Sequence, residues 1–137
     1  RARLLYIEDN ALNVLLVEEL LATCRGLSVR SEPDGARGVA RAQAMRPDLV
    51  LVDMQLPDFD GLEVLRRLRA DARTAAIPCI ALSANAMPAD IARAVAAGFN
   101  DYVTKPIDFA VLMKTIDEVL AARGAEPATT RPGELPP

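Results

Sequence analysis

The sequence predicts a single α/β domain with five parallel strands, each followed by a helix. Short apolar segments alternate with longer segments of helical period from residue 4 to residue 123. Strict alternation of this kind is typical of parallel strands joined by right-handed crossovers. A length of 137 residues suits one domain, and a composition that is 51% apolar is enough to build a core.

Two strands and two helices are expected in the first half of the chain. The first helix carries apolar residues at close to 3.6-residue spacing, at Leu12, Leu15, Leu16, Leu20 and Leu21. Asp34 can cap the second helix, and Pro47 is expected to end it. In order, the elements are a strand over residues 4–7, a helix over residues 10–24, a strand over residues 27–30 and a helix over residues 34–45.

Three strands and three helices are expected in the second half. Residues 49–52 form a continuous apolar run, as in a strand that is buried on both faces. Pro88 fits the first turn of the fourth helix, which ends at Gly98. The remaining elements are a helix over residues 62–70, strands over residues 79–82 and 102–103, and a helix over residues 108–123. The domain thus spans residues 1–123, and residues 124–137, rich in Pro, Ala and Thr, are expected to form a disordered tail.

The composition excludes several classes of function. Because the chain has no histidine, histidine-based acid–base catalysis, Ser-His-Asp triads and histidine metal ligands are excluded within it. A net charge of −3 provides no electrostatic footprint for nucleic acid. No apolar run reaches the ~18 residues of a membrane span. From the charge and from the length of the apolar runs, we expect this domain to contact neither nucleic acid nor a membrane. Cys24 and Cys79 are expected to be reduced thiols in a cytoplasmic protein.

Polar side chains follow four of the five predicted strands, at the point where each strand ends. In parallel α/β sheets the ligand site lies at the carboxyl ends of the strands, so these residues are the candidates for a functional site. They are Glu8 and Asp9 after the first strand, Asp53 after the third, Ser83 after the fourth, and Thr104 and Lys105 after the fifth.

Glu8, Asp9 and Asp53 are carboxylates that would converge at one edge of the sheet. Alone they would repel one another and raise one another's pKa, and Mg²⁺, which takes oxygen ligands, would relieve that cost. Asp53 follows the most buried strand and is the best candidate for a nucleophile that forms an acyl phosphate. The backbone carbonyl of Gln55 could complete the metal site. Taken singly, each carboxylate could instead cap a helix or begin a turn.

Lys105, Ser83 and Tyr102 are candidate partners of a phosphoryl group. Lys105 is one of two lysines beside fourteen arginines, and its compact ammonium can follow a phosphoryl oxygen. Its bond to Pro106 is a candidate for the cis form. Ser83 could donate a hydrogen bond to a phosphoryl oxygen, or it could cap a helix. Tyr102 could be a reporter that swings when Ser83 moves, or a strand aromatic without further role, and the sequence leaves both open.

Together these residues resemble the receiver domain of two-component response regulators. The resemblance implies a flavodoxin-like, doubly wound α/β fold, with a five-stranded parallel sheet in the order 2-1-3-4-5 and helices on both faces. The matching segments are Ile7-Glu8-Asp9-Asn10, Val52-Asp53-Met54-Gln55-Leu56-Pro57, Asp60-Gly61, Ala81-Leu82-Ser83-Ala84 and Thr104-Lys105-Pro106.

The resemblance also implies a metal-dependent phosphoacceptor. Glu8, Asp9, Asp53 and the backbone carbonyl of Gln55 would hold Mg²⁺. Asp53 would accept the phosphoryl group from a phosphohistidine on a histidine kinase or a histidine phosphotransfer domain. The domain would catalyse its own phosphorylation and dephosphorylation.

Three further residues are implied in signal output. Ser83 and Lys105 would bind the phosphoryl oxygens, and Tyr102 would be the aromatic switch. The signal would pass through the face made by the fourth helix, the fifth strand and the fifth helix, which could also support a homodimer.

Two segments narrow the subtype. Residues 8–13 and 81–86 are similar to receivers fused to the C-terminus of hybrid sensor histidine kinases. A first residue of Arg1 instead of methionine agrees with a piece of such a longer protein. We therefore expect a cytoplasmic domain whose parent protein could be anchored in a membrane.

Two other functions remain as alternatives. A phosphatase of the haloacid dehalogenase type also uses an aspartate nucleophile and Mg²⁺, but it usually has a second aspartate where this chain has Gln55. A pseudo-receiver would keep the fold as a docking module without phosphorylation. Turnover of a phosphomonoester would favour the first alternative, and failure to bind Mg²⁺ would favour the second.

Overall fold

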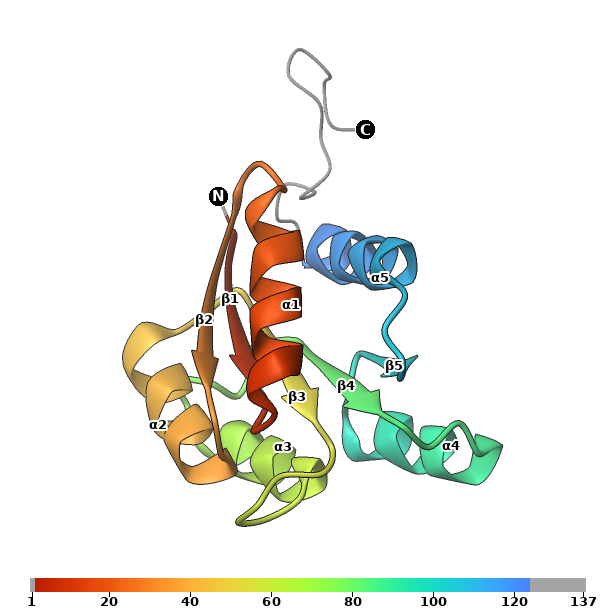
Figure 1. Cartoon of the computed structure of the whole chain (residues 1–137). Coiled ribbons are helices and arrows are strands. Elements are labelled where there is room, and N and C mark those ends of the chain that lie inside the picture. Colours follow the sequence, from red (N-terminus) through yellow and green to blue (C-terminus); the bar gives the residue numbers. More distant parts are fainter. Residues whose placement is uncertain (1, 124–137) are drawn as a thin grey trace.

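A computed structural model describes residues 2–123 of the chain. At its centre is a parallel sheet of five strands in the order β2-β1-β3-β4-β5 (Figure 1). The strands are β1 (Ala2–Ile7), β2 (Leu27–Glu32), β3 (Leu49–Asp53), β4 (Cys79–Ser83) and β5 (Asp101–Thr104). The predicted strand order is confirmed, and the predicted disordered tail over residues 124–137 lies outside the described residues.

Helices cover both faces of this sheet, which makes the fold doubly wound and flavodoxin-like as expected. α1 and α5 pack on one face, whereas α2, α3 and α4 pack on the other. The helices are α1 (Ala11–Ala22), α2 (Gly35–Met45), α3 (Gly61–Ala70), α4 (Pro88–Ala97) and α5 (Phe109–Ala122). Every predicted element is present.

Each face of the sheet has its own aliphatic core, because successive strand residues point to opposite faces. In β1, Leu4 and Tyr6 belong to the core under α1 and α5, whereas Leu5 and Ile7 belong to the core under α2, α3 and α4. β3 is buried at every position, as its continuous apolar run predicted. The carboxyl end of β3, where Asp53 lies, is therefore held by both cores.

Helix α1 forms where the leucine spacing predicted it, but most of those leucines do not face the core. Val17 and Leu21 are buried, whereas Leu12, Leu15 and Leu16 are 73%, 53% and 52% exposed. The helix is apolar on several sides, so the spacing of its leucines could not identify the buried face.

The helix ends follow side-chain capping rules in most cases. Asp34 caps α2 as predicted, by accepting a hydrogen bond from the N–H of Arg37. α4 has no such side-chain cap and begins with Pro88 in its first turn. The C-cap of α2 is Arg46, which adopts a left-handed φ of 48°. Pro47 follows this C-cap directly and cannot continue the helix, so α2 ends at Met45, where the sequence predicted.

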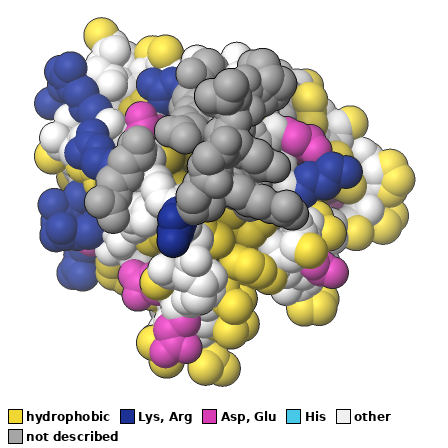
Figure 2. Space-filling model, turned by 90° about the horizontal axis from the view of Figure 1, so that it is seen from above, with side chains coloured by type: hydrophobic (Ala, Val, Ile, Leu, Met, Phe, Trp, Pro, Cys, Tyr) yellow, Lys and Arg dark blue, Asp and Glu magenta, His cyan; other side chains and the backbone are white. Residues whose placement is uncertain are grey.

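The molecular surface carries paired charges on the side of α2 and α3. Figure 2 looks from above Figure 1, at the end where the strands begin, and shows Lys and Arg side chains gathered on the side where α2 lies. On these two helices the ion pairs include Arg37–Asp34, Arg66–Glu63 and Arg67–Glu63. Arg37 has an acid of its own, whereas Arg66 and Arg67 share Glu63, so the positive charge of α3 is only partly offset by these pairs.

Two remaining expectations concern membrane spans and thiols. Within residues 2–123, none of the helices has the length and apolar character needed to cross a bilayer. Both cysteines are free thiols, with Cys79 buried and Cys24 partly exposed.

Candidate functional site

Three predicted carboxylates come together at the carboxyl edge of the sheet. Ile7 of β1 is paired with Val52 of β3, so Glu8 and Asp53, the next residues, lie side by side. One carboxylate oxygen from each of Glu8, Asp9 and Asp53 lies within 4.8 Å of the other two. Glu8 and Asp53 are buried, and Asp9 is exposed. These three residues are called the acidic cluster below.

Glu8 is held by three hydrogen bonds. Its Oε1 accepts one from the Tyr6 hydroxyl at 3.0 Å and one from Lys105 Nζ at 2.9 Å, and its Oε2 accepts one from the N–H of Asn10 at 3.3 Å. Tyr6 is fully buried. Tyr6 was not among the predicted site residues, although its place two residues before Glu8 is the spacing at which strand side chains share a face.

Asp53 contacts the predicted lysine and the loop that follows β3. Lys105 Nζ lies 3.3 Å from Asp53 Oδ2, and the N–H of Gln55 donates to Asp53 Oδ1 at 3.0 Å. The main chain of Lys105 is fixed by its N–H, which donates to the Ser83 carbonyl at 2.8 Å. The Lys105–Pro106 peptide bond is cis, the form for which the sequence made it a candidate. Lys105 thus bridges two members of the acidic cluster.

The electrostatics of the site differ between its two buried carboxylates. Burial and the neighbouring Glu8 raise the pKa of Asp53 to about 6. Burial alone would raise the pKa of Glu8 as well, but interactions with Asp53 and Lys105 bring it below its usual value. Burial alone would lower the pKa of Lys105, yet its hydrogen bond to Glu8 and the charge of Asp53 raise it. The charge on Asp53 is therefore the costly one, and an added cation would stabilise it.

Ser83 and Tyr102 are linked through the main chain of Asn85. The N–H of Asn85 donates to Ser83 Oγ at 3.1 Å, and the carbonyl of Asn85 accepts the Tyr102 hydroxyl at 2.6 Å. The Asn85 side chain donates to Asp90 in the first turn of α4 at 2.7 Å. Ser83 does not cap α4, because the N-cap position is Met87. Asn85 was not among the predicted site residues, because its contacts to Ser83 and Tyr102 are made by the main chain and have no residue-type signature.

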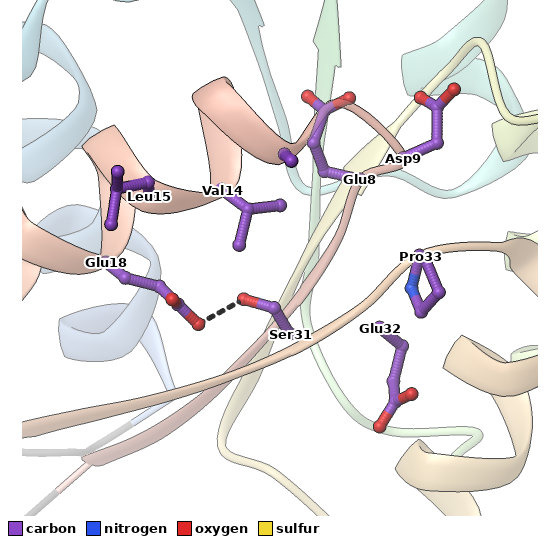
Figure 3. A pocket seen from close by; sticks show the side chains of 9 residues that line it. Glu8, Asp9, Val14, Leu15, Glu18, Ser31, Glu32 and Pro33 are labelled. Carbon is purple, nitrogen blue, oxygen red and sulfur yellow. Dashed lines mark hydrogen bonds between the residues drawn. The ribbon is translucent and has the colours of Figure 1, made fainter.

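Two hollows adjoin the acidic cluster and its partners. One of about 320 Å³ is lined by polar groups that include Gln55, Ser83 and Tyr102, so three predicted site residues border the same space. The other, of about 410 Å³, lies between α1 and β2 and has Glu8 and Asp9 in its wall (Figure 3).

Most of the polar residues that line the hollow between α1 and β2 are acidic. Figure 3 shows Glu18 of α1 accepting a hydrogen bond from Ser31 of β2, at 2.7 Å. Glu32 lies at the same wall, and Val14 and Leu15 supply the apolar part. Glu32 is paired with Arg41 and Glu8 with Lys105, so part of the negative charge along this side of α1 is offset.

The donor set of the acidic cluster suits a hard divalent cation such as Mg²⁺. Carboxylate oxygens are ligands that Mg²⁺ prefers, and an exposed position such as that of Asp9 leaves room for the waters that Mg²⁺ keeps. Glu8 and Asp53 are two buried carboxylates with one ammonium between them, an arrangement that a further positive charge would stabilise. The residues present therefore fit this ion.

Comparison with known proteins identifies the family. The family model for the response regulator receiver domain matches residues 4–117. Protein PilH of Pseudomonas aeruginosa is 36% identical over 120 residues, which cover 88% of this chain and 98% of PilH. The transcriptional regulatory protein CseB of Streptomyces avermitilis is 38% identical over 136 residues, which cover 98% of this chain and 56% of CseB. The chain thus spans little more than half the length of CseB.

Solved structures share the fold. The receiver domain of sensor histidine kinase PA1611 from Pseudomonas aeruginosa, solved with a magnesium ion in its active site cleft, is 34% identical with a TM-score of 0.78, over 90% of this chain and 98% of that one. Chemotaxis protein CheY4 of Vibrio cholerae is 26% identical with a TM-score of 0.81, over 87% of this chain and 98% of that one. From its fold, its sequence and its acidic edge, this chain belongs to the receiver domains of response regulators in two-component systems.

Proposed function

We propose that Asp53 accepts a phosphoryl group, in a Mg²⁺-dependent reaction, from a phosphohistidine on a histidine kinase or a histidine phosphotransfer domain. The observation that carries this proposal is the setting of Asp53, a buried carboxylate at the end of β3 with Lys105 Nζ 3.3 Å from its Oδ2. Glu8 and Asp9 lie beside it. The sequence contains no histidine, so the donor belongs to another domain or protein.

The proposed step is a substitution at phosphorus. A carboxylate oxygen of Asp53 forms a bond to the phosphorus atom while the bond from phosphorus to the imidazole nitrogen breaks. The nitrogen keeps the electron pair and takes up a proton, and Asp53 becomes an acyl phosphate. The ammonium of Lys105 and the hydroxyl of Ser83 then bind phosphoryl oxygens, because both can donate hydrogen bonds to them.

Glu8, Asp9, Asp53 and the backbone carbonyl of Gln55 are the groups that we propose as the holders of Mg²⁺. Bound there, the ion would offset the negative charge of the incoming phosphoryl group. Asp53 must be ionised to attack phosphorus, and its raised pKa opposes ionisation. A cation next to Asp53 favours the ionised carboxylate, which is the form that attacks phosphorus. Metal binding should therefore increase the fraction of Asp53 that can react.

The proposed output switch runs from Ser83 through Asn85 to Tyr102. When Ser83 turns its hydroxyl toward a phosphoryl oxygen, the N–H of Asn85 loses its acceptor. The carbonyl of Asn85, which holds the Tyr102 hydroxyl, then shifts with the main chain. The affected face is formed by α4, β5 and α5, where Met87, Val95 and Val111 are exposed apolar residues available to a partner.

Intact-mass measurement after incubation with Mg²⁺ and acetyl phosphate tests the proposal. We expect one added phosphoryl group on the wild-type chain and none on Asp53→Asn or without Mg²⁺. Asp71→Asn is a suitable control, because Asp71 pairs with Arg73 away from the acidic cluster and its variant should still be labelled.

The alternatives have distinct outcomes in the same assay. If a receiver of known activity is labelled and this chain is not, the pseudo-receiver alternative is favoured. Hydrolysis of a generic phosphomonoester that depends on Asp53 would favour the phosphatase alternative. The phosphatase alternative is disfavoured by Gln55, because an amide cannot serve as the acid–base group that such a phosphatase has at this position.

The wider context of the chain stays a set of predictions. Membership of the receiver family does not by itself imply three of them: a place at the C-terminus of a hybrid histidine kinase, a cytoplasmic location, and a homodimer through α4, β5 and α5. Sedimentation of the chain with and without acetyl phosphate tests the homodimer. An unchanged monomer in both states would remove that face as a self-association surface.

A further inference from the structure

The loop between β3 and α3, residues 54–60, is joined to a helix that lies outside the acidic cluster. Asp58 Oδ1 accepts a hydrogen bond from the N–H of Gly35 at 2.9 Å, and Asp58 Oδ2 accepts one from the N–H of Ala36 at 2.8 Å. Both donors belong to the first turn of α2. One carboxylate therefore ties the segment that follows Asp53 to the start of a helix more than twenty residues earlier in the chain.

An aromatic contact reinforces this connection. A Cβ added at Gly35 would lie 2.5 Å from Cε1 of Phe59, so the ring lies directly against the glycine backbone. The guanidinium of Arg67, a residue of α3, lies over the Phe59 ring, with Cζ 4.0 Å from the ring centroid. Phe59 is thus held between α2 and α3.

The opposite end of the loop reaches the acidic cluster. The N–H of Gln55 donates to Asp53 Oδ1 at 3.0 Å, and the N–H of Gly61 donates to the Met54 carbonyl at 3.2 Å. Only two residues separate Gln55 from Asp58. Because Leu56 and Pro57 are the two residues between them and proline fixes its own φ, fixing Asp58 restricts the main chain at Gln55.

α2 has a second carboxylate cap that does not involve this loop. Asp34 precedes the helix and accepts a hydrogen bond from the N–H of Arg37 at 2.7 Å. Asp34 and Asp58 therefore satisfy different N–H groups in the same first turn, which would otherwise have no partner within the helix. Of these two carboxylates, only Asp58 connects that turn to the loop beside Asp53.

We propose that Asp58 is a positioning residue that holds the main chain at Gln55 in place and couples metal binding at the acidic cluster to the first turn of α2. The metal part of this inference rests on the proposed function. It adds a route from the acidic cluster toward α2, separate from the route through Tyr102. Because coupling between two equilibria is reciprocal, Mg²⁺ must strengthen the contact of Asp58 with α2 by the same factor by which that contact strengthens Mg²⁺ binding.

The first experiment compares Asp58→Ala with Asp34→Ala in the full chain. Each variant removes one negative charge from the same helix turn; Asp58 accepts from two of its N–H groups, and Asp34 accepts from one and pairs with Arg37, so we expect both to lower the urea midpoint of unfolding. Titration calorimetry with MgCl₂ should show a Kd that rises about fivefold or more in Asp58→Ala and less than about twofold in Asp34→Ala. Equal changes in both variants would mean that Asp58 only stabilises the helix, and would overturn the proposal.

Gly35→Ala tests the same connection without changing any charge. Its new Cβ displaces the Phe59 ring and with it the loop, so the Kd for Mg²⁺ should rise as in Asp58→Ala. A variant with wild-type Mg²⁺ affinity would show that the loop keeps its place without this contact.

Amide hydrogen exchange supplies a measurement that needs no metal. In the metal-free protein, the N–H of Gln55 should exchange faster in Asp58→Ala and Gly35→Ala than in the wild type, and at the wild-type rate in Asp34→Ala. Unchanged exchange at Gln55 in Asp58→Ala would overturn the positioning role by itself. If the wild-type chain bound no Mg²⁺, the proposed function and the coupling would both fail, while the exchange rates would still decide the positioning role.

Reciprocity provides the last comparison. Mg²⁺ should slow exchange at the N–H groups of Gly35 and Ala36 in the wild type, because those groups donate to Asp58. The same ion should leave their exchange unchanged in Asp58→Ala. Slowing of equal size in both proteins would contradict the coupling.

Discussion

At the scale of single residues, Glu8 and Asp53 are two buried carboxylates that contact a single ammonium group, that of Lys105. The Tyr6 hydroxyl donates to Glu8 and adds to the preference for the ionised form of Glu8. No comparable hydroxyl is described at Asp53 within residues 2–123, and the pKa of Asp53 lies at about 6 because of burial and of Glu8. The metal-free protein therefore carries an unfavourable charge at neutral pH.

Replacing Asp53 by Asn should stabilise the metal-free protein at pH 7.5, by about 1–3 kcal/mol. The pKa of Asp53 is higher in the folded than in the unfolded protein, so the folded protein binds the extra proton and its stability falls as the pH rises through about 6. The gain from Asp53→Asn should accordingly be smaller at pH 5. Urea unfolding at both pH values measures it, with the exposed Glu118→Gln as a control that should change little.

Cys79 provides a second test at this scale. Burial raises the pKa of its thiol to about 11, so both access and thiolate formation are suppressed in the folded protein. Iodoacetamide at pH 8 should alkylate the partly exposed Cys24 and spare Cys79, and urea should make both react. Peptide mapping separates the two sites, and rapid native alkylation of Cys79 would contradict the described burial.

At the scale of elements, the helices differ in how closely they approach the sheet. α2 comes so near to β1 that a Cβ added at Gly38 would overlap the Ile7 side chain, 2.7 Å from its Cγ1. α1 by contrast leaves Leu12, Leu15 and Leu16 substantially exposed. The close approach of α2 fixes the end of β1, and therefore the position of Glu8.

Gly38→Ala should destabilise the protein by about 1–3 kcal/mol, because the added methyl group overpacks the core against Ile7. In an unobstructed helix the same change stabilises by about 1 kcal/mol, so the sign of the effect tests the contact. Urea unfolding measures the change. The double variant Gly38→Ala/Ile7→Val should recover part of the loss, and simple additivity of the two single effects would argue against direct contact.

At the scale of the whole molecule, the candidate site is assembled from strand ends and from the loops that follow them. Glu8 follows β1, Asp53 ends β3, Ser83 ends β4 and Lys105 follows β5. The two aliphatic cores hold these strands in one sheet, so the geometry of the acidic cluster depends on the folding of the entire domain. A ligand that bridges these strand ends should therefore stabilise the fold globally.

Mg²⁺ should raise the Tm of the wild-type chain through this linkage. At a concentration of 100 times its Kd, a ligand that binds only the folded state contributes about 2.7 kcal/mol. Asp9→Ala should weaken Mg²⁺ binding strongly and lose most of the shift, and because Asp9 is exposed the variant should still fold. Thermal unfolding with MgCl₂ and with NaCl at equal ionic strength separates metal binding from screening, and an equal Mg²⁺ shift in both proteins would count against the site.

Most of the fold and the membership of the acidic cluster could be predicted from the sequence. Alternation of strand and helix patterns sets which residues fall at the carboxyl ends of the strands, and that alone brings Glu8, Asp9, Asp53 and Lys105 to one edge. The capping role of Asp34 was equally predictable, because a cap depends only on neighbouring residues.

Other features were decided only by the tertiary structure. Three features have no signature in residue type or spacing: the buried side of α1, the main chain of Asn85 between Ser83 and Tyr102, and the contact of Asp58 with α2. For Tyr6 the spacing places its side chain on the same face as Glu8, but only the packed structure shows the hydrogen bond between them. The physical reason is the range of the interactions. Local periodicity and strand order act along the chain and can be recognised in it, whereas hydrogen bonds between distant segments and the pKa values that follow from burial exist only once those segments have packed together.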